Sequence, residues 1–205
     1  MILDIGGCWG WHWRDLHRDR PDLVVVILDF VKSNLLHAKN LLGGRVNESV
    51  FLVHGDATAL NFPDASFDAV WTVQTFQHIP DFERAVTEAY RVLKPGCLFS
   101  NYSLNVQPYL RMLYGLLQRP YIIEDWVPDS FWLARASKKQ KSLIASIFGE
   151  PVCERWSEIL YSPELHLSLP GRLGSRLGWI DSRLSNDSGF LGWFARQRSF
   201  HCRKK

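Results

Sequence analysis

The stretch that decides the fold is residues 1–11, which read M-I-L-D-I-G-G-C-W-G-W. Residues 1–5 are a short apolar run typical of a buried strand, and Gly6, Gly7 and Gly10 follow directly. Residues 11–19 are predicted to form a helix that ends before Pro21, because proline cannot continue a helix. A strand, a glycine turn and a helix N-terminus together indicate a corner that cradles a nucleotide.

Asp4 lies inside the apolar run, immediately before the glycines. A carboxylate in a buried strand is costly unless it is hydrogen-bonded. The N–H groups of the glycine turn are its expected partners, so we predict that Asp4 pins the turn.

Length and composition limit the class of protein. A chain of 205 residues and 23.7 kDa, with 46% hydrophobic and 22% charged residues, predicts one soluble globular domain. The four cysteines are far apart, which argues against a zinc site or a disulfide framework and favours a reducing, cytoplasmic location; they are Cys8, Cys97, Cys153 and Cys202. The sequence shows no signal peptide and no run of ~18 apolar residues, so no membrane span is expected.

The charge is unevenly distributed along the chain. The formal net charge is only +3, which is too small to imply a nucleic-acid partner. From Arg172 onward there are eight Lys or Arg residues against two acids, so this part carries +6 and the preceding residues sum to −3. A solvated basic tail is the preferred interpretation, with an anionic partner as the alternative.

The second predicted strand gives the corner a neighbour. Residues 23–28 (LVVVIL) form a continuous aliphatic run, typical of a strand buried on both faces of a parallel sheet. Asp29 follows at its carboxyl end, ~20 residues after the glycine turn, which is the spacing of an acid that binds ribose hydroxyls in a βαβ unit. A helix over 33–42 should come next and end at Gly43.

Strands and helices continue to alternate downstream. Further strands are expected at 50–53, 67–75 and 97–102, with a helix from Asp81 to Lys94 before the last of these. This order predicts an α/β fold with a doubly wound, mostly parallel sheet.

The regular alternation weakens after the fifth strand. We expect a helical and aromatic insertion over 104–170, with helices at 108–117 and 138–148. Two late apolar runs, at 179–184 and 192–201, are predicted to form a closing antiparallel strand pair within 171–205, ahead of the basic tail. The whole chain, residues 1–205, is taken as a single domain.

Four segments carry a family resemblance. They are I-L-D-I-G-G-C-W-G at 2–10, G-D-A at 55–57, F-P-D-A-S-F-D-A-V-W-T-V-Q-T-F-Q-H-I at 62–79 and A-Y-R-V-L-K-P-G at 89–96. In this order and spacing they resemble the class I S-adenosylmethionine-dependent methyltransferases, above all the group that acts on small molecules. The resemblance covers residues 1–103, half of the chain, and implies a Rossmann-like sheet. It also implies that S-adenosylmethionine is the cofactor and that a small molecule is the methyl acceptor.

The resemblance also implies roles for individual residues. Gly6, Cys8 and Gly10 would lie under the amino-acid part of the cofactor, Asp29 would hold the ribose hydroxyls, and Asp56 with Ala57 would address the adenine. The strand-four residues would line the methionine and substrate side. The full expected cofactor set is Asp4, Gly6, Gly7, Cys8, Gly10, Asp29, Phe30, Asp56, Ala57, Thr72, Val73 and Gln74, with no metal ligand.

Methyl transfer needs a general base only when the acceptor is a protonated group such as a hydroxyl. His78 is the first residue considered for that role, followed by Tyr102 and Tyr109. The alternative for His78 is a partly buried histidine that closes the loop after strand four.

Two departures from the family pattern concern the corner itself. The usual loop is D-x-G-C-G-x-G, and here Cys8 stands where its second glycine is expected. If that backbone position needs a positive φ, a cysteine costs energy there, unless the loop shifts by one residue onto Gly7. The family also has a helix before the first strand that this sequence does not show, which suggests a misplaced start, a fragment or an open pocket.

The aromatic residues have two interpretations each. Trp9, Trp11 and Trp13 are expected to form one cluster beside the loop, either against a substrate or, more commonly, as core or lid. The aromatics of 121–133 would cover the active site or form the core of the insertion. Cys8 could be a reactive thiol but is better explained as a small structural residue.

Other functions remain as alternatives at this point. One is a degenerate, non-catalytic domain that keeps the fold as a binding module, and another is a truncated gene product. A nucleic-acid methyltransferase is less favoured, because the chain lacks an N/D-P-P-Y/F motif.

Overall fold

The structure, a computed structural model, describes residues 1–105, 108–118, 138–159, 179–181, 183–184 and 190–205. Its strands are β1 (Ile2–Ile5), β2 (Val25–Asp29), β3 (Val50–His54), β4 (Phe67–Val73), β5 (Leu93–Leu104), β6 (Cys153–Ser157) and β7 (Gln197–Arg203). Its α-helices are α1 (Leu16–Asp19), α2 (Lys32–Leu42), α3 (Phe82–Val92), α4 (Pro108–Leu116) and α6 (Lys138–Phe148). Short 3₁₀ helices are η1 (Trp11–Trp13), η2 (Gly43–Arg45), η3 (Phe76–His78) and η5 (Leu191–Trp193).

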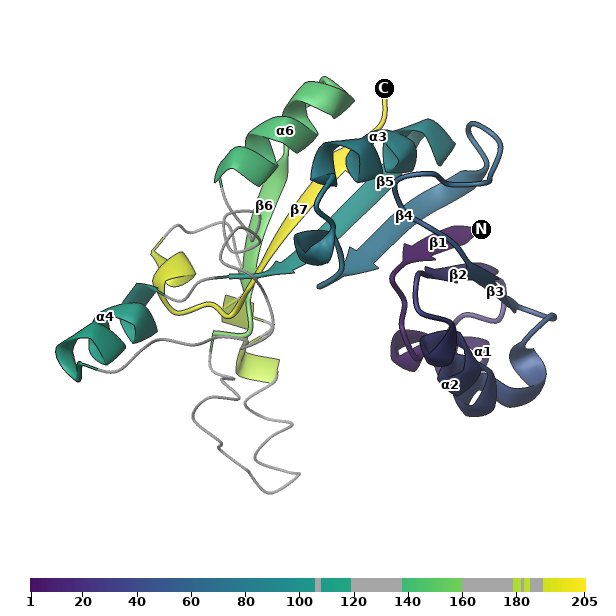
Figure 1. Ribbon diagram of the computed structural model, residues 1–205, viewed down its shortest axis with the longest axis horizontal. Coiled ribbons are helices and arrows are strands. Elements are labelled where there is room, and N and C mark those ends of the chain that lie inside the picture. Colours follow the sequence, from purple (N-terminus) through teal and green to yellow (C-terminus); the bar gives the residue numbers. More distant parts are fainter. Residues whose placement is uncertain (106–107, 119–137, 160–178, 182, 185–189) are drawn as a thin grey trace.

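The strands form one sheet in the order β3-β2-β1-β4-β5-β7-β6 (Figure 1). The first five strands in this order are all parallel, and the register places Leu3 of β1 between Val26 of β2 and Val70 of β4. The predicted doubly wound α/β sheet is therefore confirmed. Because parallel strands end at the same edge, the turns after β1, β2, β3 and β4 gather there.

The antiparallel side of the sheet corrects one prediction. β7 pairs antiparallel with β5, as the expected strand near 192–201 required. Its predicted partner at 179–184 is wrong, because residues 179–181 and 183–184 are helical and the edge strand is β6. β6 reads C-E-R-W-S and is held partly by an ion pair between Glu154 and Arg198 of β7, at 2.7 Å. No apolar periodicity marks such a strand in the sequence.

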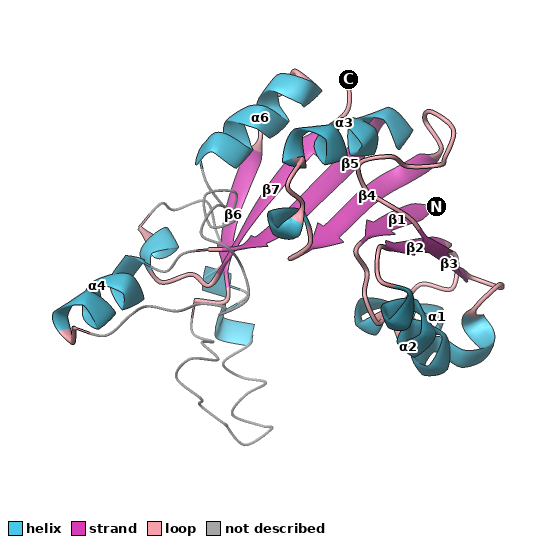
Figure 2. Cartoon of the chain, in the orientation of Figure 1, coloured by secondary structure: helices cyan, strands magenta, loops and turns pink. Residues whose placement is uncertain are grey.

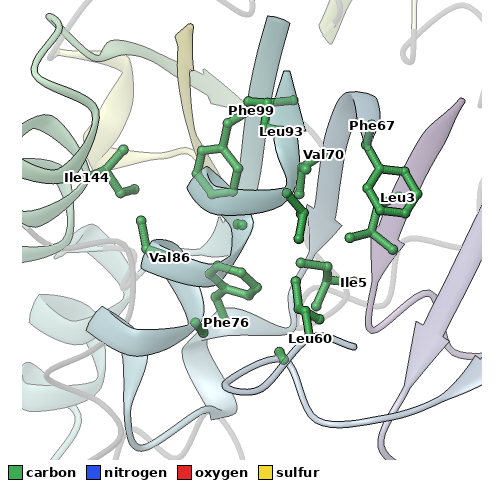
Figure 3. Packing of buried hydrophobic residues seen from close by; sticks show 14 of the residues in the cluster. Leu3, Ile5, Leu60, Phe67, Val70, Phe76, Val86, Leu93, Phe99 and Ile144 are labelled. Atoms are coloured by element: carbon green, nitrogen blue, oxygen red, sulfur yellow. The ribbon is translucent and has the colours of Figure 1, made fainter. Parts of the chain in front are cut away.

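Hydrophobic side chains pack on both faces of the sheet. Leu3 and Ile5 of β1 face a core that includes Phe76, Phe99 and Val86 (Figure 3). The helices α3 and α6 lie beside each other over this face of β4, β5, β7 and β6 (Figures 1 and 2). The second core lies against α1 and α2 and contains Leu16, Val25, Ile27, Ala38, Leu42 and Val50. Residues of β2 alternate between the two cores, which explains why this strand is a continuous aliphatic run.

Two further predictions need correction. The single helix expected over 11–19 is divided into η1 and α1, because Asp15 has a non-helical φ of −104° and ψ of 5°. The last basic residues are not a free tail, although Arg203 and Lys205 are exposed, and Arg172 and Arg176 lie outside the described residues. Residues 197–203 form β7 between two other strands, and Lys204 donates to the carbonyl of Tyr90 at 2.8 Å.

The region that contains the predicted aromatic cover, residues 121–133, lies outside the described residues. Across the described ranges, no helix has both the length and the apolar character that a membrane crossing requires.

Candidate functional site

The turn after β1 takes a left-handed path. Gly6, Cys8 and Gly10 have φ values of 72°, 50° and 70°. Only glycine adopts such angles without cost, so the prediction that Cys8 stands at a position that favours glycine is confirmed. Gly7 is not among the residues with positive φ, and the alternative in which the loop shifts onto Gly7 is therefore wrong.

The same turn packs too closely for side chains. A Cβ at Gly6 would lie 2.2 Å from the Thr75 side chain, and one at Gly7 would lie 2.4 Å from Oδ2 of Asp4. A Cβ at Gly10 would lie 2.8 Å from Leu42. We call residues 4–10 the β1 corner. Its three glycines are therefore required by close packing against Thr75, Asp4 and Leu42.

Asp4 is fully buried beneath this corner, with 1% of its surface exposed. Its Oδ2 accepts a hydrogen bond from the indole Nε1 of Trp13 at 2.6 Å, so the partner we describe is a side chain and not the expected loop N–H groups. Burial raises the pKa of Asp4 to about 7; the Trp13 bond opposes the rise, and the nearby charge of Asp29 adds to it. Asp4 therefore titrates near neutral pH.

Asp29 ties the β1 corner to the end of β2. It is 5% exposed, its Oδ2 accepts from the backbone N–H of Cys8 at 2.9 Å, and its Oδ1 accepts from the N–H of Val31 at 2.8 Å and from Asn34 Nδ2 at 3.2 Å. A carboxylate has about four lone-pair positions. Three are used here, which leaves room for one ligand hydroxyl.

The ends of β2 and β3 bring the other predicted residues to the same edge. Phe30 is 70% exposed, and its carbonyl oxygen lies 3.0 Å from Nε2 of His54. Asp56 forms a tight turn, with Oδ1 accepting from the N–H and the hydroxyl of Thr58 at 2.8 Å each, and Ala57 beside it is buried. Phe30 thus offers an open aromatic surface near two acidic residues.

A cavity of about 150 Å³ opens at the β1 corner and is lined by Asp4, Gly6, Gly7, Cys8, Trp9, Trp11, His12 and Val73. Typical small-molecule pockets measure roughly 300 to 1,000 Å³. The cavity therefore suits one end of a ligand. Of the predicted strand-four residues, Val73 lines it, whereas Thr72 is fully buried on the α3 side and Gln74 follows in a left-handed turn with a φ of 54°.

The three tryptophans do not form one cluster. Trp9 donates to Asn34 on α2, at 3.3 Å from Nε1 to Oδ1. Trp11 lies under the guanidinium of Arg14, 4.3 Å from the ring centre. Trp13 turns to Asp4. The sequence spacing predicted one cluster, but Trp9 precedes η1, and Trp11 and Trp13 at the two ends of η1 have different partners.

The turn after β4, residues 74–78, meets the β1 corner directly. The hydroxyl of Thr75 donates to the carbonyl of Gly6 at 3.2 Å and to that of Val73 at 3.1 Å. Gln77 is 1% exposed, and its Oε1 accepts from the N–H of Leu104 at 2.8 Å. The Nε2 atoms of Gln77 and His78 are 3.1 Å apart. We call this segment the β4 corner.

Sequence reasoning found His78 at the β4 corner but missed Thr75 and Gln77. The polar run Q-T-F-Q-H was visible, yet nothing in it distinguishes a buried glutamine from an exposed one.

The two tyrosines considered as bases lie elsewhere. Tyr102 lines a second cavity of about 610 Å³, with Trp71, Arg155 and His201, and burial raises its pKa. Tyr109 of α4 packs against Phe194, with 5.2 Å between the ring centres. Within the described residues, no three His, Cys, Asp or Glu side chains are grouped as a metal site would require.

Comparisons with known proteins agree with this arrangement. Residues 3–100 match the family model of a methyltransferase domain. The ubiquinone/menaquinone biosynthesis C-methyltransferase of Methylobacterium nodulans is 37% identical over 99 residues, which cover 48% of this chain and 39% of that protein. The demethylmenaquinone methyltransferase of Thermus thermophilus is 39% identical over 120 residues, which cover 58% of this chain and 53% of that protein. The chain thus spans about half or less of the length of these curated relatives.

A solved structure shows the same fold across the whole chain. It is an S-adenosylmethionine-dependent methyltransferase of Thermotoga maritima, described as a possible histamine N-methyltransferase. The TM-score is 0.66 at 18% identity, and the match covers 100% of this chain and 81% of that one. At this identity the likeness concerns the fold alone.

Proposed function

This chain belongs to the class I S-adenosylmethionine-dependent methyltransferases through residues 3–100, and on that basis we propose that it transfers a methyl group from S-adenosylmethionine to a small-molecule acceptor. The observation that carries the proposal is the β1 corner. Its backbone is left-handed at Gly6, Cys8 and Gly10, and the N–H of Cys8 donates a hydrogen bond to the buried side chain of Asp29.

The described residues fit this cofactor. Gly6, Gly7 and Cys8 line the cavity at the β1 corner, and Asp29 keeps one lone-pair position for a ribose hydroxyl. Exposed Phe30 would lie against the adenosine. The residues proposed to hold the cofactor are Asp4, Gly6, Gly7, Cys8, Gly10, Asp29, Phe30, Asp56, Ala57, Thr72, Val73 and Gln74. Thr72 would act from beneath, since its side chain is buried.

The cofactor, when bound, supplies a methyl group on a positively charged sulfur that is already activated for transfer. The protein therefore has to bind, orient and exclude water more than it has to activate. Asp4 and Asp29 place two acidic side chains at the corner that would receive a cationic ligand, and Asp4 carries its negative charge only above neutral pH. His78, in the β4 corner beside it, is proposed as the polar residue of the acceptor side.

Several features support the acceptor class and the location. One of the two relatives above is named for ubiquinone and menaquinone biosynthesis and the other for demethylmenaquinone, which favours a small molecule. Two C-terminal arginines are engaged by acids, Arg196 by Glu158 and Arg198 by Glu154, at 2.7 Å each, which argues against nucleic acid as the acceptor. Four unpaired cysteines favour a reducing compartment such as the cytoplasm.

Calorimetric titration with S-adenosylmethionine and with S-adenosylhomocysteine tests the proposal. We expect both to bind, and Asp29→Ala to weaken binding about 10- to 100-fold, as loss of a hydrogen bond to a charged group does. Asp22→Ala is the matched control, because Asp22 is an exposed acid paired with Arg20 at 2.6 Å. Circular dichroism verifies that each variant is folded. Failure of both ligands to bind the parent, or equal affinity in Asp29→Ala, contradicts the proposal.

A further inference from the structure

The buried amide of Gln77 has only one possible orientation. The backbone N–H of Leu104 can only donate, so the atom that faces it at 2.8 Å must be the carbonyl oxygen of Gln77. The NH₂ group of Gln77 therefore faces Nε2 of His78 at 3.1 Å. Because Gln77 is 1% exposed, water competes little for either bond.

This orientation fixes the tautomer of His78. An amide NH₂ can only donate, so Nε2 of the imidazole must accept. A neutral imidazole whose Nε2 accepts carries its proton on Nδ1. The ring could take up a second proton at Nε2 only if the hydrogen bond from Gln77 broke, since two donors would then oppose each other.

We propose that Gln77 is a positioning residue that holds His78 as the Nδ1–H tautomer, so that His78 serves the site as a hydrogen-bond donor and not as a general base. The link to methyl transfer rests on the proposed function, whereas the tautomer does not. An acceptor that meets His78 and no other base would then have to bring a nucleophilic atom that has already lost its proton, such as a phenolate, an enolate or an unprotonated amine.

Gln77 also connects His78 to the rest of the fold. Leu104 is the last residue of β5, and from there the chain leaves the sheet. Thr75, two residues before Gln77, bonds to Gly6 of the β1 corner. The His78 ring is thus linked through Gln77 to the end of β5, and Thr75 of the same turn is linked to the β1 corner.

The tautomer can be measured directly on the full chain without cofactor or acceptor. Long-range ¹H–¹⁵N correlation spectra of protein labelled with ¹⁵N-histidine distinguish protonated from unprotonated ring nitrogens, and His78→Asn identifies the His78 signals by their loss. We expect the parent to show Nδ1 protonated and Nε2 unprotonated. In Gln77→Glu the carboxylate can only accept, so it should draw the proton to Nε2 and reverse the pattern.

Gln118→Glu, at an exposed glutamine, is the matched control and should leave the His78 signals unchanged. Nε2–H in the parent, or the same tautomer in Gln77→Glu as in the parent, overturns the proposal. If Gln77→Glu does not fold, the parent spectrum alone decides. Calorimetry with S-adenosylmethionine on the parent keeps the two proposals apart, because a parent that does not bind the cofactor contradicts the proposed function and leaves the tautomer assignment intact.

Discussion

The β1 corner and the β4 corner lie side by side at one edge of the sheet but are built in different ways. The β1 corner is shaped by backbone, with Gly6, Cys8 and Gly10 in left-handed conformations and no space for added Cβ atoms at its glycines. The β4 corner is shaped by side-chain hydrogen bonds, from Thr75 to Gly6 and from Gln77 to Leu104 and His78. We therefore expect added side-chain atoms to destabilise the β1 corner, and removed or exchanged polar atoms to disrupt the β4 corner.

This difference fits the proposed division of labour. A cofactor of constant shape is served by a rigid backbone surface. The side that would receive the methyl acceptor is shaped by side chains that donate or accept hydrogen bonds. Gln77→Glu replaces the donor that faces His78 with an acceptor. Asp4 is the exception in the β1 corner, because its contribution depends on a proton.

The largest effect we expect tests that exception. With a native pKa of about 7 and an ordinary value of 3.8, Asp4 binds its proton more tightly in the folded than in the unfolded state. The stability it contributes is complete below pH 4 and is lost as the pH rises through 7, by roughly 4 kcal/mol at most. Asp4→Asn should remove this dependence, so that the variant gains stability relative to the parent, by roughly 2.6 kcal/mol, as the pH rises from 5 to 8.

Urea denaturation of both proteins between pH 5 and 8 measures this difference, since the other titrating groups are common to both. Asp56→Asn is the control, because Asp56 is an exposed acid at the same edge and should follow the parent. If the free energies of unfolding of the parent and Asp4→Asn changed with pH in parallel, the protonation of Asp4 would make no contribution to stability.

The next effect breaks the β1 corner by adding one methyl group. Gly6→Ala places a Cβ 2.2 Å from the Thr75 side chain at a φ of 72°, so it combines overpacking with left-handed strain. We expect a loss of about 3 kcal/mol in the free energy of unfolding. Gly96→Ala separates the two causes, because Gly96 has a φ of 75° with nothing within 4 Å of an added Cβ, and it should lose only about 1 kcal/mol. Equal losses in denaturant titrations would mean that contact with the β4 corner does not matter.

The same contrast explains what the sequence could predict. The β1 corner depends on residue types with distinctive conformational needs, so glycines after an aliphatic run and Asp29 after the next strand were sufficient to locate it. The parallel order followed from continuous buried runs such as LVVVIL. The sequence also predicted the conformational cost at Cys8, because this residue stands where the family pattern has a glycine, and its φ is 50°.

The β4 corner and the partner of Asp4 could not be found in this way. Whether Gln77 is buried, and which atom of its amide faces His78, depends on Leu104 arriving from β5, a contact between residues 27 positions apart. Trp13 reaches Asp4 from the last position of η1, a bond between residues nine positions apart. The edge strand β6 depends on its ion pair with β7 and on no periodicity of its own. Long-range polar contacts leave little trace in local sequence patterns.

The smallest expected effect concerns Cys8, the residue with a left-handed backbone in the β1 corner that is not a glycine. Cys8 is exposed, and its side chain is not needed for the bond from its N–H to Asp29. Cys8→Gly relieves left-handed strain but adds freedom to the unfolded chain, so we expect a net gain of only about 0.5 kcal/mol in urea denaturation. Cys8→Ala, which keeps a Cβ, should show no such gain. Calorimetry on the same variants distinguishes a working transferase from a degenerate binding module: affinity for S-adenosylmethionine should change little in Cys8→Gly. If binding appeared only in that variant, the natural loop would be one that no longer holds the cofactor.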